Sequence, residues 1–167
     1  MSFPKLFCNP GKGYVTMYIK IEDLNTDTVN GVAVQLPGSV KAEKETYFEW
    51  TPSSLTADYK KAQICGGMLK CWHHKPEFSR AEFHEDKETF QFVSGTALMF
   101  FIDIKDGRAL MDTPRVVRIQ PGTKIIIEAG KGHFVPIAEG DEPLCAVVES
   151  PKMEAPKVEL PEEICAG

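Results

Sequence analysis

Glu82, His84 and Glu88 lie within seven residues at the start of the stretch EFHEDKETFQFVSG. Residues two apart in a strand share a face, so Glu82 and His84 are expected to point the same way, and Glu88 to share a face with Phe90 and Phe92. A carboxylate among phenylalanines is costly to bury without a partner. A bound metal ion would provide that partner.

His133 offers a fourth ligand, after a glycine-rich turn in GTKIIIEAGKGHFVPI. Carboxylates and imidazoles together suit divalent manganese, iron, nickel or zinc, and oxygen-rich sets favour manganese or iron. We therefore predict a divalent metal held by Glu82, His84, Glu88 and His133, without identifying the ion. The alternative is that Glu82 and Glu88 are solvated charges that protect a strand edge from pairing.

Two further residues are candidates with weaker signals. His73 and His74 are expected on opposite faces of one strand, so at most one enters the interior. His73 is either a hydrogen-bonded core residue or a substrate-binding group. Glu128 follows the apolar run KIII, and is either a surface carboxylate at a strand end or a catalytic general base near the metal, a role also open to Glu88.

The elements that would position these residues are strands. Short apolar runs are separated by turn residues, with little helical periodicity, and Asp106-Gly107 is a strong hairpin signal. We expect strands near residues 12–20, 31–36, 68–72, 96–104, 116–119, 124–129, 133–138 and 145–149. The pattern predicts an all-β, single-domain chain, residues 1–167, folded as an antiparallel barrel or jelly roll with at most one or two short helices.

Three segments differ from this pattern. Residues 51–62 begin with N-cap residues and could form one short helix. Residues 151–167 contain three prolines and are expected to form an extended tail, either free or packed against a second subunit. Residues 44–50 alternate polar and aromatic side chains, which favours a half-buried strand over a recognition surface.

Composition excludes several classes of function. The net charge is −5 and the basic residues are scattered, so we expect no nucleic-acid partner. No apolar run approaches the roughly 20 residues of a membrane span, and the N-terminus lacks a signal-peptide core, which indicates a soluble, cytoplasmic protein without a membrane partner. Five widely spaced cysteines without a CxxC pair predict buried free thiols rather than disulfides or a thiolate zinc site.

The spacing of the first candidate ligands resembles a motif of the cupin superfamily, G(X)5HXH(X)3-4E(X)6G. His84, Glu88 and Gly95 match its second half without a gap. Glu82 stands where the first histidine is usual, and Pro76 where the leading glycine is usual. The resemblance implies that His84 and Glu88 are metal ligands, and Glu82 can ligate in place of the histidine.

The region around His133 resembles the second cupin motif, G(X)5PXG(X)2H(X)3N. Gly122, Gly130 and His133 match it, whereas Glu128 replaces the proline and Ile137 the asparagine. Metal-binding cupins use the histidine of this motif as a ligand, which implies the same role for His133. The superfamily resemblance also implies a jelly-roll barrel.

Over most of its length the chain resembles the ureidoglycolate lyase branch of the cupins, also called ureidoglycolate hydrolases. The segments MYIKIEDLNTDTVNGVAVQLPG, LKCWHHKP, AEFHEDK and VELPEEICAG carry this resemblance. It departs at His73, Glu128 and residues 132–136, where that family has other residues around the substrate.

This resemblance implies a metal-dependent enzyme of allantoin degradation that cleaves a carbon–nitrogen bond of ureidoglycolate, giving glyoxylate and urea. It also implies a homodimer with a small-molecule substrate. The alternative is a barrel without turnover that binds a sugar or a small carboxylic acid.

Overall fold

The computed structural model describes residues 15–167, which form strands and no helix. Cys8 and the start of the strand expected at 12–20 lie outside these residues. The strands are β1 (Thr16–Ile19), β2 (Ile21–Asp23), β3 (Val32–Gln35), β4 (Glu43–Lys44), β5 (Glu49–Trp50), β6 (Ile64–Cys71), β7 (Glu77–Glu82), β8 (Glu88–Ser94), β9 (Ala97–Lys105), β10 (Arg108–Ala109), β11 (Arg115–Ile119), β12 (Lys124–Ile127), β13 (Lys131–His133), β14 (Ile137–Ala138), β15 (Leu144–Pro151) and β16 (Lys157–Ala166).

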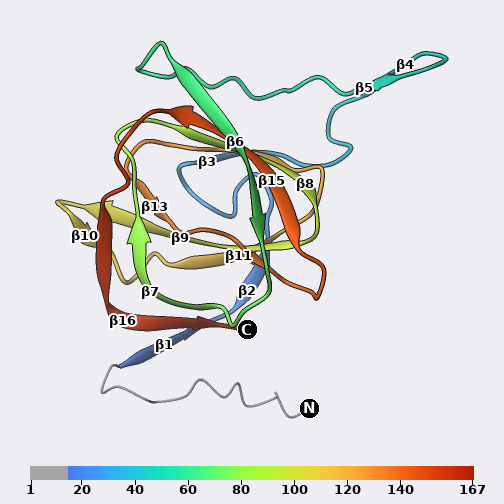
Figure 1. The fold of residues 1–167 in the computed structure, drawn as a ribbon. Coiled ribbons are helices and arrows are strands. Elements are labelled where there is room, and N and C mark those ends of the chain that lie inside the picture. The colour runs from blue at the N-terminus through green and yellow to red at the C-terminus, as the bar shows by residue number, and fades with distance from the viewer. Residues whose placement is uncertain (1–14) are drawn as a thin grey trace.

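Two sheets face each other and form a barrel (Figure 1). The larger has the order β1-β16-β7-β13-β9-β11-β2, with β10 and β14 also paired to β9, and the smaller has the order β3-β12-β8-β15-β6. Pairing is antiparallel except between β1 and β16 and between β2 and β11. The jelly-roll prediction is confirmed by this architecture.

The core lies on both faces of β9. Met99 and Phe101 face the interior between the sheets, where Phe90 and Phe92 of β8 also pack. Phe100 lies in a second apolar cluster on the other face. Because both faces are buried, β9 reads as a continuous apolar run instead of alternating.

The hairpin signal after β9 is also confirmed. Lys105 pairs with Arg108 across a two-residue loop, and Asp106 and Gly107 have φ values of 50° and 71°. Positive φ at both positions is the geometry of a type I′ turn, which follows the twist of the strands. β10 therefore folds back directly onto β9.

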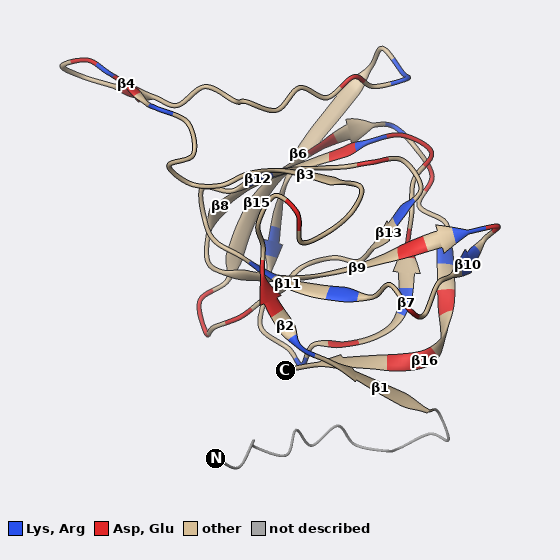
Figure 2. Ribbon diagram, turned by 180° about the vertical axis from the view of Figure 1, so that it is seen from behind, with Lys and Arg blue, Asp and Glu red and all other residues tan. Residues whose placement is uncertain are grey.

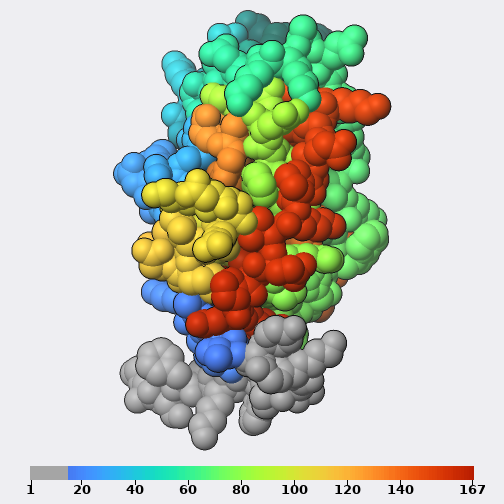
Figure 3. Space-filling view, turned by 90° about the vertical axis from the view of Figure 1, so that its left-hand side faces the viewer, coloured from blue at the N-terminus to red at the C-terminus, as the bar shows by residue number. Residues whose placement is uncertain are grey.

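The C-terminal segment is part of the barrel. β16 pairs with β7 on one side and β1 on the other, and Leu160, Ile164 and Ala166 are buried in the core. In the space-filling view this segment forms a continuous column (red) on the face of the molecule (Figure 3). Residues 151–167 are thus extended, and β16 packs against this chain's own strands.

Residues 51–62 do not form the expected helix. Ser53 Oγ accepts a hydrogen bond from the Leu55 amide, and Gln35 Oε1 accepts one from the Ser54 amide. Such local side-chain bonds compete with helical ones. The amides of Lys60 and Lys61 are bonded to another part of the chain, so nothing extends a helical turn.

Residues 44–50 form a projecting hairpin of β4 and β5 and not a half-buried strand (Figure 2). Tyr47 is 96% exposed, and Phe48 and Trp50 are also exposed. The alternation of polar and aromatic residues therefore does not reflect burial on one face.

The cysteines differ in state. Cys71 is buried and Cys145 partly buried, both with free thiols, as expected, but Cys65 is exposed and Cys165 is disulfide-bonded. The expectation of buried free thiols is therefore wrong for Cys65 and Cys165.

Among residues 15–167 there is no helix long and apolar enough to cross a membrane.

Candidate metal centre

The pairing of β13 with β7 brings the first two candidate ligands together. His133 lies directly opposite Glu82 in that pair, and opposite Phe101 of β9 on its other side. Residues opposite each other in a sheet present their side chains on the same face. Since Phe101 faces the interior, His133 and Glu82 point there as well.

His84 and Glu88 reach the same point from the turn between β7 and β8. The strand ends at Glu82, so His84 lies in the turn and not in the strand as expected. Glu88 opens β8 and precedes the inward residues Phe90 and Phe92 at the spacing of one face, as the sequence suggests.

The ligand atoms of these residues converge. One atom each of Glu82, His84 and His133 lie within 4.8 Å of one another. His133 Nε2 is 3.0 Å from Glu88 Oε2 and 4.0 Å from Glu82 Oε1. His84 Nε2 is 3.7 Å from the same Glu88 oxygen. The structure thus brings the four predicted metal ligands into one cluster.

Backbone carbonyls fix both imidazole rings. His84 Nδ1 lies 3.0 Å from the carbonyl of Glu154, and His133 Nδ1 lies 3.2 Å from that of Lys131. A carbonyl oxygen only accepts, so each Nδ1 carries the proton. The Nε2 lone pairs are left to face the cluster, which is the arrangement of metal-binding histidines.

The cluster fits a cation because its polar atoms are not satisfied among themselves. His84 Nε2 is buried and has no hydrogen-bond partner. The 3.0 Å contact between His133 Nε2 and Glu88 Oε2 is a hydrogen bond only when Nε2 carries a proton, and a metal ion would take the place of that proton. A divalent ion would accept all of these donor atoms, and imidazole with carboxylate suits the transition metals predicted from the sequence.

A small pocket opens beside the cluster. Its volume is about 280 Å³. Its lining combines the two glutamates with apolar and glycine residues: Gly67, Met68, Leu69, Glu82, Glu88, Phe90, Val135, Pro136 and Val148. Phe90 was expected to share a face with Glu88, and Val135 and Pro136 belong to the segment 132–136 noted in the sequence. The lining residues of β6 and β15 gave no signal there, because they reach β8 only through the pairing of distant strands.

The structure does not bring Glu128 into the cluster. Its carboxylate pairs with Lys87 Nζ at 3.0 Å, and it lines a different hollow, beside Gly31 and Val32. β12 ends at Ile127, so Glu128 lies past the inward-facing part of the strand. This is the arrangement of a surface carboxylate.

His73 and His74 lie beyond the end of β6, so they do not share a strand as expected. His73 is exposed, its Nδ1 is bonded to the carbonyl of Ala138 at 3.0 Å, and it does not line the pocket beside the cluster. The ring is held at the surface and offers no contact to the four ligands.

Asp86, between two ligands in the chain, was not recognised from the sequence. It is 2% exposed. Burial would raise the pKa of its carboxyl group, but hydrogen bonds from the amides of Lys87, Lys60 and Lys61 outweigh this and hold the pKa below its usual range. The signal that could have found it is an aspartate inside a short turn, where it commonly caps backbone amides.

Comparisons with known proteins identify structures with a similar fold but no protein with a matching sequence. No protein-family model and no curated protein matches the sequence. An oxalate decarboxylase from Bacillus subtilis aligns over 58% of this chain at 21% identity and a TM-score of 0.41, and the chain covers 24% of that protein's length. The sugar 3,4-ketoisomerase QdtA from Thermoanaerobacterium thermosaccharolyticum aligns over 75% of this chain and 84% of its own, at 11% identity and a TM-score of 0.50.

At these identities the similarity concerns the fold alone. Together with the strand topology, it shows that the chain shares the jelly-roll fold of this ketoisomerase. Neither of these structures is a ureidoglycolate lyase.

Proposed function

We propose that the protein is a metal-dependent enzyme that acts on a small hydroxy acid, as ureidoglycolate lyase does. The observation that carries this is the convergence of Glu82, His84, Glu88 and His133, with two Nε2 atoms facing the cluster. The resemblance of the sequence to the ureidoglycolate lyase branch supplies the substrate class.

Glu82, His84 and His133 would hold the ion, since one ligand atom of each lies within 4.8 Å of the other two. A divalent ion bound there would supply Lewis-acid polarisation of the substrate hydroxyl or carboxylate. The ring orientation that this requires is set by the two carbonyls that accept from Nδ1.

Glu88 is the group that we assign to proton transfer. It lines the pocket and its side chain is 13% exposed, so it can reach a bound substrate while largely shielded from water. Glu88 would accept the proton of the substrate hydroxyl as the carbonyl of glyoxylate forms and the carbon–nitrogen bond breaks. Glu88 would then return this proton to the departing nitrogen, which leaves as urea.

The pocket supports a small substrate. A volume of about 280 Å³ is at or below the lower end of ordinary ligand sites. None of its described lining residues is lysine or arginine. An anionic substrate would therefore depend on the metal ion for a positive partner in this pocket.

Metal analysis of protein purified without chelators tests the site. We expect about one divalent ion per chain in the wild type, and loss of the ion in His133→Ala. Glu149→Gln, an exposed carboxylate on β15, serves as the control and should keep the ion. A wild type that binds no divalent ion would contradict the proposal.

Release of glyoxylate from ureidoglycolate tests the reaction. Loss of a positioned general base typically costs about 10²- to 10⁴-fold in rate, so Glu88→Gln should lose most activity. A wild type that binds the ion and a small acid without turnover would instead support the binding-module alternative.

A further inference from the structure

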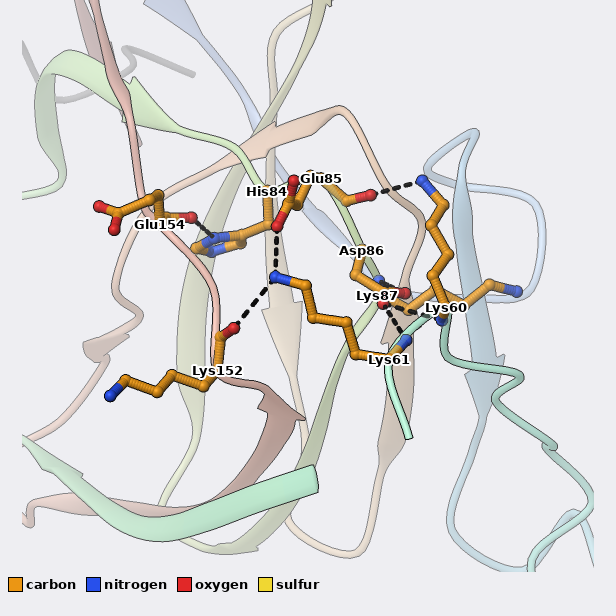
Figure 4. Close-up of polar contacts among 8 residues, drawn as sticks. All are labelled: Lys60, Lys61, His84, Glu85, Asp86, Lys87, Lys152 and Glu154. Atoms are coloured by element: carbon orange, nitrogen blue, oxygen red, sulfur yellow. Dashed lines mark hydrogen bonds and ion pairs between the residues drawn. The ribbon is translucent and has the colours of Figure 1, made fainter. Parts of the chain in front are cut away.

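The segment at residues 51–61, here called the strap, is fastened to the turn that carries His84. The amides of Lys60 and Lys61 donate to Asp86 Oδ2 at 2.8 and 3.2 Å (Figure 4). Asp86 Oδ1 accepts from the amide of Lys87 at 2.8 Å. One buried carboxylate thus joins the strap to the turn between two candidate ligands.

The side chain of Lys61 makes a second connection. Its ammonium group lies between Glu85 Oε1 and the carbonyl of Lys152, which it reaches at 3.1 Å (Figure 4). Glu85 directly follows His84 in the turn. Lys152 lies two residues before Glu154, whose carbonyl accepts from His84 Nδ1. Lys61 therefore bridges the two segments on either side of the imidazole.

This arrangement determines where His84 Nε2 points. The ring is attached to the turn and is oriented by the carbonyl of Glu154, so its direction depends on the separation of these two segments. The main chain of His84 is also fixed, because its carbonyl accepts from the amide of Gly130 at 2.8 Å. The segment between β15 and β16, which contains Glu154, is held near the turn by the bond from Lys61 to the carbonyl of Lys152 and by the bond from the Phe83 amide to the carbonyl of Pro156.

We propose that Lys61, together with Asp86, is a positioning residue for the metal centre, which holds His84 as the Nδ1–H tautomer with Nε2 directed at the ion. This inference rests on the metal site proposed above. Partners in the surroundings of a ligand histidine commonly change metal affinity by about 10- to 100-fold. No hydrogen bond or ion pair joins the strap to a ligand side chain in the described structure, so its effect passes through the turn and the Glu154 carbonyl.

Lys61→Met tests the bridge, because it removes the ammonium group and keeps the aliphatic part of a side chain that is 45% exposed. Lys152→Met is the matched control. It removes the same charge from the same neighbourhood, but the bridge uses only the carbonyl of Lys152 (Figure 4). Asp86→Asn is a second variant, which weakens the other connection without changing the side-chain shape.

Two readouts are needed. In the metal-free protein, ¹⁵N chemical shifts of His84 report its tautomer. We expect the Nδ1–H form in the wild type and Lys152→Met, and a mixture of tautomers in Lys61→Met. In titrations with Mn²⁺ and Zn²⁺, Lys61→Met should bind at least about 10-fold more weakly than Lys152→Met. Thermal unfolding of the metal-free variants shows whether any loss reflects general destabilisation.

The outcomes separate this inference from the proposed function. A wild type that binds no ion contradicts the proposed function, and the tautomer of His84 in Lys61→Met then still decides whether the bridge positions the ring. A Lys61→Met protein with the wild-type tautomer and wild-type affinity overturns the inference and leaves the metal site intact. Equal weakening in Lys61→Met and Lys152→Met would also overturn it, since charge alone would then explain the effect.

Discussion

At the scale of single residues, the protein shows how neighbours decide the chemistry of one side-chain type. His84 and His133 are buried and held by carbonyls, whereas His73 and His74 are exposed beyond a strand end. The residues next to them in the sequence do not distinguish the two buried histidines from the two exposed ones. All four Nδ1 atoms are bonded to backbone carbonyls, so what separates the pairs is burial and the surroundings of Nε2.

The free cysteines allow a prediction at this scale. Burial raises the pKa of the Cys71 thiol, with nearby Cys145 adding to the effect, whereas Cys65 is exposed. A thiol with a raised pKa has less of the reactive thiolate at any given pH. At pH 8, iodoacetamide should therefore label Cys65 quickly and Cys71 only after unfolding, as read by peptide mass spectrometry. Equal labelling of the two in the folded protein would contradict this.

At the scale of elements, turns set how the strands meet. The glycine at the end of β8, Gly95, has a φ of 73°, and a Cβ there would lie 2.8 Å from the Cα of Leu144. Gly95 is also one of the residues that resemble the first cupin motif. Its role in this structure is to let β8 turn into β9 against the start of β15.

Comparing Gly95→Ala with Gly38→Ala separates two contributions to the loss of stability at Gly95, the left-handed backbone conformation and the close approach of the Leu144 backbone. Gly38 has nearly the same φ, 72°, with nothing within 4 Å of an added Cβ. Its replacement should cost only the left-handed conformation, about 1–2 kcal/mol of the free energy of unfolding. Gly95→Ala should cost about 1–3 kcal/mol more, because backbone atoms must also move. Chemical denaturation gives both values, and equal losses would show that the close approach is unimportant.

At the scale of the whole molecule, stability comes from two sheets closed by the C-terminal strand. β16 supplies buried side chains to the cluster on the outer face of β9 and joins β7 to β1. The hairpin of β4 and β5 lies outside this core, and its aromatic side chains are exposed. The barrel and not the hairpin should therefore account for the free energy of unfolding.

A pair of matched substitutions tests this distribution. Ile164 of β16 is fully buried and Ile64 of β6 is 43% exposed. Ile164→Ala should destabilise the protein by about 2–5 kcal/mol, through lost burial and the cavity that remains. Ile64→Ala should cost clearly less, since much of its side chain is already in water. If denaturation midpoints shift equally, β16 does not contribute to the core as described.

The local pattern of the sequence was enough for most of the strands, the Asp106-Gly107 hairpin and the chemical type of the candidate ligands, but it did not predict β16 in a segment expected to be a tail. These features depend on residues close in the chain, such as the spacing of Glu88, Phe90 and Phe92 on one face. Local pattern failed at residues 44–50 and 51–62. The conformation of these two segments depends on whether another part of the chain covers them or forms hydrogen bonds with them, as Asp86 does with the strap.

Which residues meet at the site was fixed by tertiary contacts. The register that sets His133 opposite Glu82, and the carbonyl of Glu154 at His84, join positions some 50 to 70 residues apart. The same contacts left Glu128 with Lys87 and His73 at the surface. The residue types determine which side chains have atoms that can bind a metal ion. Which of these side chains lie close enough together to bind the same ion depends on long-range strand pairing and burial.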